Sequence, residues 1–219
     1  MSSPGETLMK LLEIYVTLLE KQGFQAWWPG ETDFEVCLGA ILTQNTSWTN
    51  VEKALDNIKS NSLMSPDKLL NVGRDRIAHL IRPSGYFNQK ATYLESFCKF
   101  IKEQPIRELK KMDLTEARAL LLGLKGIGKE TADSILLYAM DFPIFVVDAY
   151  TKRIFSRLGV CKESVSYDDL QDIFHKDLLT DVELFKDYHA QIVMLGKDTC
   201  RKIPQCERCV LKKNGFCIF

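Results

Sequence analysis

Residues 122–132 read Leu-Gly-Leu-Lys-Gly-Ile-Gly-Lys-Glu-Thr-Ala, and three of these eleven positions are glycine. Helical periodicity on either side predicts a helix that ends at Gly123 and a second helix that begins after Gly128. Glycine in the connecting turn permits positive φ angles and a close approach of the backbone to a partner. The first amides of the second helix have no acceptor within that helix, so they favour an anion. The stretch therefore predicts a tight hairpin with a phosphate-binding helix start.

This hairpin is either a tight turn between two core helices or a helix-hairpin-helix motif, which holds a DNA phosphate without reading the base sequence. A bare Gly-x-Gly would not separate the two interpretations. The Leu-x-Gly-Leu that precedes it and the Lys-x-Thr-Ala-Asp that follows it favour the motif. On this interpretation the DNA-binding residues of the hairpin are Gly126, Ile127, Gly128, Lys129 and Thr131.

The rest of the chain also predicts helices. Apolar residues recur at helical spacing, no segment alternates at period two, and the strand-like run Phe145-Val146-Val147 is short. We therefore expect an all-α fold of two helical lobes with a cleft between them. The expected lobes are residues 32–142, which contain the hairpin, and residues 1–31 together with 143–219. The main expected helices span 6–22, 34–42, 47–60, 88–102, 114–123, 128–139, 149–158, 166–179 and 182–196.

Composition excludes several classes of protein. The chain has 219 residues, of which 46% are hydrophobic and 26% charged, as in soluble globular proteins. It has no apolar run of the ~18–20 residues that a membrane span needs, and we expect no secretory signal at its start. We therefore expect a cytoplasmic (nucleoid-associated) or nuclear protein. The net charge is zero, but residues 197–219 hold six basic and two acidic side chains, which suits either a phosphate-facing surface or an ordinary solvated one.

Four of the seven cysteines lie close together near the C-terminus. Cys37, Cys98 and Cys161 are scattered in apolar or helical surroundings and are expected to be small core residues. Four thiolates within eighteen residues predict a tetrahedral metal site, with which zinc and a 4Fe–4S cluster are both compatible. These four, separated by five, two and seven residues, are Cys200, Cys206, Cys209 and Cys217.

Asp148 follows the apolar run 142–147 and precedes a predicted helix. Its commoner role would be to cap that helix. Its other role would be catalytic. A carboxylate in an apolar cleft stabilises the positive charge that develops on a sugar ring when a glycosidic bond breaks, and it orients a water molecule. The hairpin upstream of Asp148 favours the catalytic role.

These motifs resemble the endonuclease III superfamily of DNA glycosylases. The resemblance extends from about Glu31 to Cys217. It implies a six-helix barrel that carries the hairpin and a terminal helical domain with an iron–sulfur loop, which together flank a DNA-binding cleft. The residues that carry it are Gln44 in Leu42-Thr43-Gln44-Asn45-Thr46, Gly126-Ile127-Gly128, Thr131-Ala132-Asp133, Val147-Asp148 and the four C-terminal cysteines.

The resemblance also implies roles for single residues. Asp148 corresponds to the catalytic carboxylate, and Gln44 corresponds to the glutamine that fills the gap left by an extruded base. The four cysteines correspond to the ligands of a 4Fe–4S cluster, although the family's outer spacings are six and five residues and those of this chain are five and seven. The implied partner is double-stranded DNA with a damaged base, bound by a monomer. A monovalent cation beside the phosphate is implied at the carbonyls of Leu122, Leu124 and Ile127.

Glu130 departs from the bifunctional members of this family, which carry a lysine directly before the Thr-Ala. That lysine attacks C1′ and forms the Schiff base that leads to strand cleavage. A carboxylate cannot form an imine, and Lys129 is about 100° away around the helix. The sequence therefore predicts a monofunctional glycosylase whose nucleophile is water. Glu130 either lines the cleft as a second acid of the catalytic site or faces solvent.

All three tryptophans lie between Trp27 and Trp48. They form either a hydrophobic plug or, with Pro29, a stacking pocket for a flipped base. An N-alkylated purine is cationic, so electron-rich indoles attract it, and it leaves with little help from a general acid. Trp27, Trp28, Pro29, Trp48 and Glu130 together resemble the 3-methyladenine DNA glycosylases of the endonuclease III type, which implies an alkylated base as substrate.

The sequence leaves other functions open. A glycosylase for uracil, thymine mispairs or oxidised pyrimidines would use the same scaffold. A non-catalytic DNA-binding module would keep the hairpin and the cysteines, but it would not need Asp148 or the aromatic run. A redox protein ranks last, because no flavin or nicotinamide fingerprint accompanies the cysteines. The three histidines, His79, His175 and His189, are interpreted as structural.

Overall fold

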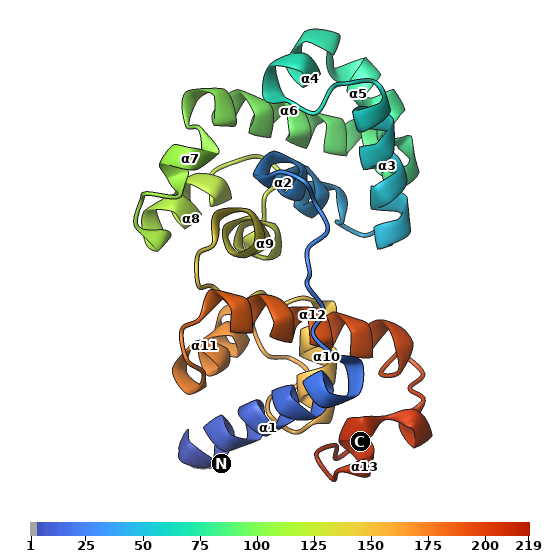
Figure 1. The fold of residues 1–219 in the computed structure, drawn as a ribbon, viewed down its shortest axis with the longest axis vertical. Coiled ribbons are helices and arrows are strands. Elements are labelled where there is room, and N and C mark those ends of the chain that lie inside the picture. Colours follow the sequence, from blue (N-terminus) through green and yellow to red (C-terminus); the bar gives the residue numbers. More distant parts are fainter. Residues whose placement is uncertain (1–3) are drawn as a thin grey trace. The chain divides into compact units, whose positions relative to one another are not determined.

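The computed structural model describes residues 4–219, with the side chains of the first helix described from Lys10 onward. These residues form helices and connecting loops and no β-strand, which confirms the expected all-α class (Figure 1). The chain divides into two compact units. The first unit combines the N-terminal segment up to Trp27 with Pro143–Phe219, and the second unit is the continuous segment Trp28–Phe142.

The second unit is built around two buried helices, α2 and α9. Every residue from Phe34 to Leu42 in α2 and from Thr131 to Met140 in α9 is buried, as expected for helices that are enclosed on all sides. α2 packs against α9, α3 and α6. The elements of this unit are α2 (Asp33–Leu42), α3 (Trp48–Ser60), α4 (Pro66–Val72), α5 (Arg74–Leu80), the 3-10 turn η1 (Arg82–Ser84), α6 (Phe87–Glu103), α7 (Ile106–Leu109), α8 (Leu114–Leu122) and α9 (Lys129–Met140).

The first unit is held together by aromatic side chains. The rings of Phe145 and Phe174 stack with their centroids 3.8 Å apart, and Phe185 and Tyr188 meet Phe145 edge-on. The Tyr188 hydroxyl donates to the Leu11 carbonyl at 2.9 Å, which joins α12 to α1. The elements of this unit are α1 (Pro4–Gln22), α10 (Ala149–Arg157), α11 (Tyr167–Asp177), α12 (Val182–Asp198), the 3-10 turn η2 (Cys206–Arg208) and α13 (Val210–Lys213).

Several local expectations need correction or refinement. The four-residue helices α7 and α13 were not predicted, because one turn is too short to show a period. Phe145-Val146-Val147 is buried but pairs with no strand. Cys37 and Cys98 are core residues, and burial raises the pKa of both thiols, that of Cys98 to about 12. Cys161 is only half-buried, so the expectation that it is a core residue was wrong.

None of the helices in residues 4–219 combines the length and the apolarity that a membrane span requires.

Candidate active site

The helical hairpin forms where the sequence predicts it. α8 ends at Leu122 and α9 begins at Lys129, with the turn between them. Gly126 has a φ of +87°, and a β-carbon there would collide with the ring of Tyr93. Glycine is therefore required at this position both for its backbone angle and for space. Gly128 has a φ of −90° and open space around it, so neither argument applies there.

The start of α9 has the features of an anion site. Gly128 has no side chain to cap the helix, and intrahelical bonding begins where Ala132 N donates to the Gly128 carbonyl at 2.9 Å. The positive end of the helix dipole lies at this terminus. Lys129 is exposed beside it, whereas the Ile127 side chain is buried in the unit. The geometry suits a phosphate that is bound by backbone, with Lys129 near it.

Gln44 is tied directly to the hairpin. Its Nε2 donates to the Gly126 carbonyl at 2.9 Å and to Thr131 Oγ1 at 3.0 Å. Thr131 is buried, so its hydroxyl serves to hold Gln44. The structure thus brings together three of the predicted DNA-binding residues from segments that are far apart in the sequence.

A buried lysine fixes the end of α2, just before Gln44. Lys90 of α6 is 2% exposed, and its Nζ donates to the carbonyls of Leu42 at 2.8 Å and Ser84 at 2.7 Å. Burial lowers the pKa of Lys90 to about 8. A neutral amine would still have two N–H donors for these two carbonyls. Sequence reasoning missed this anchor, because a lysine in an amphipathic helix is typical of the solvent face.

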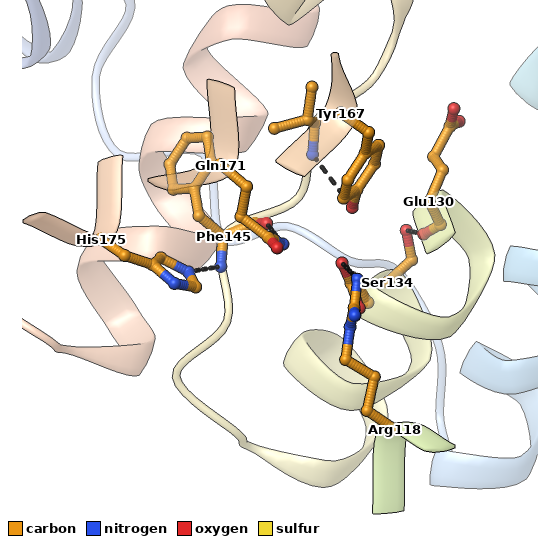
Figure 2. Close-up of polar contacts among 9 residues, drawn as sticks. Arg118, Glu130, Ser134, Phe145, Tyr167, Gln171 and His175 are labelled. Carbon is orange, nitrogen blue, oxygen red and sulfur yellow. Dashed lines mark hydrogen bonds and ion pairs between the residues drawn. The ribbon is translucent and has the colours of Figure 1, made fainter. Parts of the chain in front are cut away.

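An ion pair joins the two helices of the hairpin. Arg118 of α8 donates through Nε to Asp133 Oδ1 at 2.7 Å and through Nη2 to Oδ2 at 3.0 Å (Figure 2). The Asp133 side chain is 0% exposed and that of Arg118 is 23% exposed. Two parallel charge-assisted hydrogen bonds are both strong and directional. The pair therefore fixes α8 against α9 behind the anion site.

Trp28, Trp48 and Tyr138 form an aromatic cluster in the second unit. The centroid of the Trp28 ring lies 5.1 Å from that of Trp48 and 5.1 Å from that of Tyr138. Gly39 of α2 leaves room for both indoles, since a β-carbon there would lie 3.1 Å from Trp28 Nε1 and 3.4 Å from the Trp48 ring. Both tryptophans are half-buried. The structure therefore brings together two of the four residues predicted to form a base pocket.

The two remaining pocket residues are placed differently. Trp27 belongs to the first unit, and Pro29 is exposed. Their contribution to a base pocket stays a prediction.

Tyr138 is a member of the cluster that sequence reasoning missed. It lies eight residues after Glu130 on α9, with Ser134 halfway between them, so the three share one face of the helix. Ser134 Oγ donates to the Glu130 carbonyl at 2.7 Å, and Glu130 itself is exposed at the helix start (Figure 2). The spacing from Glu130 is the signal that would have pointed to Tyr138.

Asp148 caps α10, as one of its two interpretations predicts. Its Oδ1 accepts from Thr151 N at 2.7 Å and from Thr151 Oγ1 at 2.8 Å. Asp148 N donates back to Thr151 Oγ1 at 3.4 Å and closes a capping box. The cap uses only one carboxylate oxygen, Oδ1. The other oxygen, Oδ2, lies 3.8 Å from Nε2 of His189. Capping therefore holds the carboxylate in place without excluding a catalytic role.

The electrostatics of Asp148 keep it ionised. Its side chain is 12% exposed. Burial acts to raise the pKa of Asp148, but the contacts with His189 and Thr151 act in the opposite sense and prevail, so that the pKa lies below its usual value. His189, which the sequence suggested to be structural, is therefore the electrostatic partner of this carboxylate. A single histidine on a helix gives no signal of such a contact.

The four C-terminal cysteines lie in one region of the first unit. Arg157 Nη1 donates to Cys200 Sγ at 3.3 Å, and the Arg157 carbonyl accepts from Cys217 Sγ at 3.5 Å. Cys206 and Cys209 share a 3-10 turn in which Cys209 N donates to the Cys206 carbonyl at 3.1 Å. Burial raises the pKa of the Cys209 thiol, and its neighbours Cys200 and Cys217 add to the effect.

These thiols are not arranged as a complete metal-binding site. Among the residues described, no group of three or more metal-binding side chains is placed to hold an ion. The chemistry of the donors still fits a thiolate-bound metal or cluster, since all four are thiols and two of them, Cys200 and Cys217, contact the same arginine.

Comparison with known proteins agrees with this geometry. Residues 38–178 match the HhH-GPD superfamily of base excision DNA repair proteins. A protein of Methanocaldococcus jannaschii, provisionally assigned as a DNA repair glycosylase, is 51% identical over 95% of this chain and 96% of its own length.

Solved structures give the same result. The H. pylori 3-methyladenine DNA glycosylase MagIII, bound to 1,N6-ethenoadenine, is 32% identical, with a TM-score of 0.74 over 90% of this chain and 98% of that chain. A non-covalent endonuclease III–DNA complex shares the fold at 19% identity, with a TM-score of 0.81 over 100% of this chain and 96% of that chain. The resemblance inferred from the sequence is confirmed. The chain belongs to the HhH-GPD superfamily of base excision DNA repair proteins, and it is a DNA glycosylase of that family.

Proposed function

We propose that this glycosylase removes an alkylated purine of the 3-methyladenine type from double-stranded DNA. The observation that carries the proposal is the aromatic cluster in which half-buried Trp28 packs against half-buried Trp48 and buried Tyr138. A flipped N-alkylated purine is planar and cationic, and indole faces that are partly shielded from water attract such a ring. The H. pylori relative supports the same substrate class, since it is named a 3-methyladenine DNA glycosylase.

Asp148 supplies the catalytic charge in this proposal. Thr151 holds its Oδ1, and its pKa lies below the usual value, so the carboxylate is ionised when positive charge develops on the sugar. An ionised carboxylate stabilises that charge and orients the attacking water. The cationic base is already a good leaving group.

Duplex DNA is held by the hairpin and by Gln44 in this proposal. The start of α9 binds one phosphate through backbone, and Lys129 adds a positive charge. Gln44 fills the space left by the extruded base while Gly126 and Thr131 hold its amide.

Base release from methylated DNA tests the substrate. We expect 3-methyladenine to be released about tenfold faster than uracil, or more, because only the alkylated base carries the charge that the indoles attract. Chromatography of the released bases from methylated and uracil-containing DNA measures both rates. Uracil release at an equal or higher rate would favour the runner-up, a glycosylase for uracil, thymine mispairs or oxidised pyrimidines.

Two variants at Trp28 serve as a matched control for this experiment. Trp28→Phe keeps an aromatic face, whereas Trp28→Leu keeps only apolar bulk. The preference for the cationic base should survive in the first and fall in the second. The ratio of the two release rates within one variant is independent of how much protein is correctly folded.

We further propose that the enzyme has no strand-cleaving lyase activity, because Glu130 stands where the bifunctional members have their lysine. No covalent adduct is expected when the protein meets abasic-site DNA in the presence of borohydride, since an imine requires an amine at C1′. Gel electrophoresis detects the adduct, and an endonuclease III provides the positive control. A trapped complex with this protein would contradict the monofunctional assignment.

We propose that Cys200, Cys206, Cys209 and Cys217 hold a 4Fe–4S cluster. Such a cluster, when bound, supplies a cross-link that stabilises the C-terminal loop, whereas the chemistry on the base belongs to Asp148. Arg157 already contacts two of the four sulfur-bearing residues, so it orients the ligands. The purified protein should contain iron and inorganic sulfide in equal amounts. Stoichiometric zinc without iron would contradict the assignment.

The monovalent cation at the hairpin stays a prediction. Of its three expected ligands, the carbonyls of Leu122, Leu124 and Ile127, that of Leu124 accepts a hydrogen bond from Ile127 N at 3.1 Å. A carbonyl oxygen has two lone pairs, so Leu124 keeps one for an ion.

A further inference from the structure

The segment that leads to Asp148 is buried without a regular backbone partner. Pro143–Val147 lies outside every helix, and Phe145 and Val147 are almost completely enclosed. Buried N–H and C=O groups need hydrogen-bond partners, which a helix or a neighbouring strand normally supplies. In this protein the side chains of α11 supply them, as Figure 2 shows.

Three residues of α11 bind this backbone. Phe145 N donates to His175 Nε2 at 2.8 Å, and Gln171 Nε2 donates to the Phe145 carbonyl at 2.6 Å. Val147 N donates to the Tyr167 hydroxyl over a longer distance of 3.4 Å. The three side chains are spaced i, i+4 and i+8, so they share one face of the helix.

This face of α11 takes the place of a β-strand. In an antiparallel sheet a partner strand bonds both the N–H and the C=O of one residue and then the groups of the residue two positions along. Here side-chain atoms bond both the N–H and the C=O of Phe145 and the N–H of Val147, two positions along.

The helix that provides these partners is itself rigidly packed. The His175 ring stacks on Phe185 with an interplanar angle of 5°, and Phe174 stacks on Phe145. His175 and Phe145 are therefore locked into the same aromatic core. A hydrogen bond between two locked groups places the backbone more exactly than one made by a mobile surface side chain.

We propose that His175 and Gln171 are positioning residues for Asp148, which set the location of its carboxylate by fixing the backbone three residues before it. The inference rests on the proposed function of Asp148. The capping box holds Asp148 to α10 from the C-terminal side, and α11 holds the approach from the N-terminal side. Displacement of a catalytic group by about 1 Å costs on the order of 100-fold in rate.

The direction of the hydrogen bond at His175 provides a matched pair of variants. Nε2 accepts, so it carries the lone pair of a neutral imidazole. His175→Gln keeps an uncharged acceptor at a similar distance from the main chain. His175→Leu keeps apolar bulk and removes the acceptor. Gln171→Met is the corresponding change at the second position, because it keeps the length of the side chain and removes the donor.

Two readouts test the proposal on the full-length protein. Hydrogen exchange followed by NMR reports the Phe145 and Val147 amides, and single-turnover excision and DNA affinity report function. We expect His175→Leu to speed exchange at Phe145. We expect both His175→Leu and Gln171→Met to lower the excision rate by about 10- to 100-fold with DNA affinity within about twofold of wild type. His175→Gln should restore slow exchange and most of the rate.

The outcomes separate this inference from the proposed function. Unchanged exchange at Phe145 in His175→Leu overturns the role of α11, whatever the enzyme excises. Faster exchange with an unchanged excision rate, or an equal loss of DNA affinity, overturns the positioning role. Wild-type protein that excises no base overturns the proposed function and the catalytic half of this inference, while exchange still decides the hydrogen bonds. Should position 175 not tolerate leucine, Tyr167→Phe removes only a hydroxyl and should speed exchange at Val147.

Discussion

Asp148→Asn is expected to lower the rate of base excision by on the order of 100- to 1,000-fold and to leave DNA affinity nearly unchanged. The amide lacks the negative charge that stabilises the sugar cation. Its oxygen can still accept from Thr151 N and Thr151 Oγ1, the two donors that Oδ1 serves in the capping box. The folded structure should therefore persist. Single-turnover excision from methylated DNA and a DNA titration measure the two quantities.

The pH dependence of the same reaction checks the electrostatic argument. Because contacts with His189 and Thr151 hold the pKa of Asp148 below its usual value, the carboxylate stays ionised as the pH falls from 8 to 5. The excision rate of the wild type should show no acid limb from Asp148 in this interval.

The outcomes of the Asp148→Asn experiment separate two roles of this residue. If the variant loses both turnover and DNA binding, the result would favour a structural role for Asp148. Full excision activity in Asp148→Asn would show that the Asp148 carboxylate does not supply the catalytic charge.

Arg118→Met is expected to reduce the free energy of unfolding by about 3–5 kcal/mol, the usual cost of removing one partner from a buried ion pair. Asp133 is 0% exposed and loses two charge-assisted hydrogen bonds in this variant. The buried carboxylate then lacks the two donors that offset the cost of its burial. Urea unfolding followed by circular dichroism measures the change.

A surface ion pair serves as the control for Arg118→Met. Lys99 and Glu95 are four residues apart on α6 at 2.7 Å, with the Lys99 side chain 63% exposed. Lys99→Met should cost less than about 1 kcal/mol, because solvent screens such pairs. Similar losses in the two variants would show that the Arg118–Asp133 pair adds nothing beyond an exposed contact.

Features that arise from neighbouring residues were predictable from the sequence. The hairpin was one, because Gly123, Gly126 and the helical periods around them act over a few residues. The alternative roles of Asp148 were also visible, and the structure shows the capping box directly. The all-α class followed from the absence of alternating patterns and is confirmed.

Features that join distant segments could not be predicted. The contact of His189 with Asp148 and the bonds from α11 to Phe145 depend on how helices pack, which no local pattern encodes. Lys90 is a clear case. A lysine is normally expected at the surface, and only the packed structure brings two carbonyls to its Nζ. Tyr138 was partly predictable, because its spacing from Glu130 is visible in the sequence but its contact with Trp28 is not.

The chain order of the two units has a consequence for synthesis on the ribosome. The second unit is one continuous stretch, Trp28–Phe142, so all of its contacts form between residues that emerge in a single interval. The first unit is assembled from both ends of the chain, and α1 packs on α11, α12 and α13. Helix α1, which is translated before the second unit, must therefore wait for helices that are translated after it, while the unit that carries the hairpin completes its folding in between.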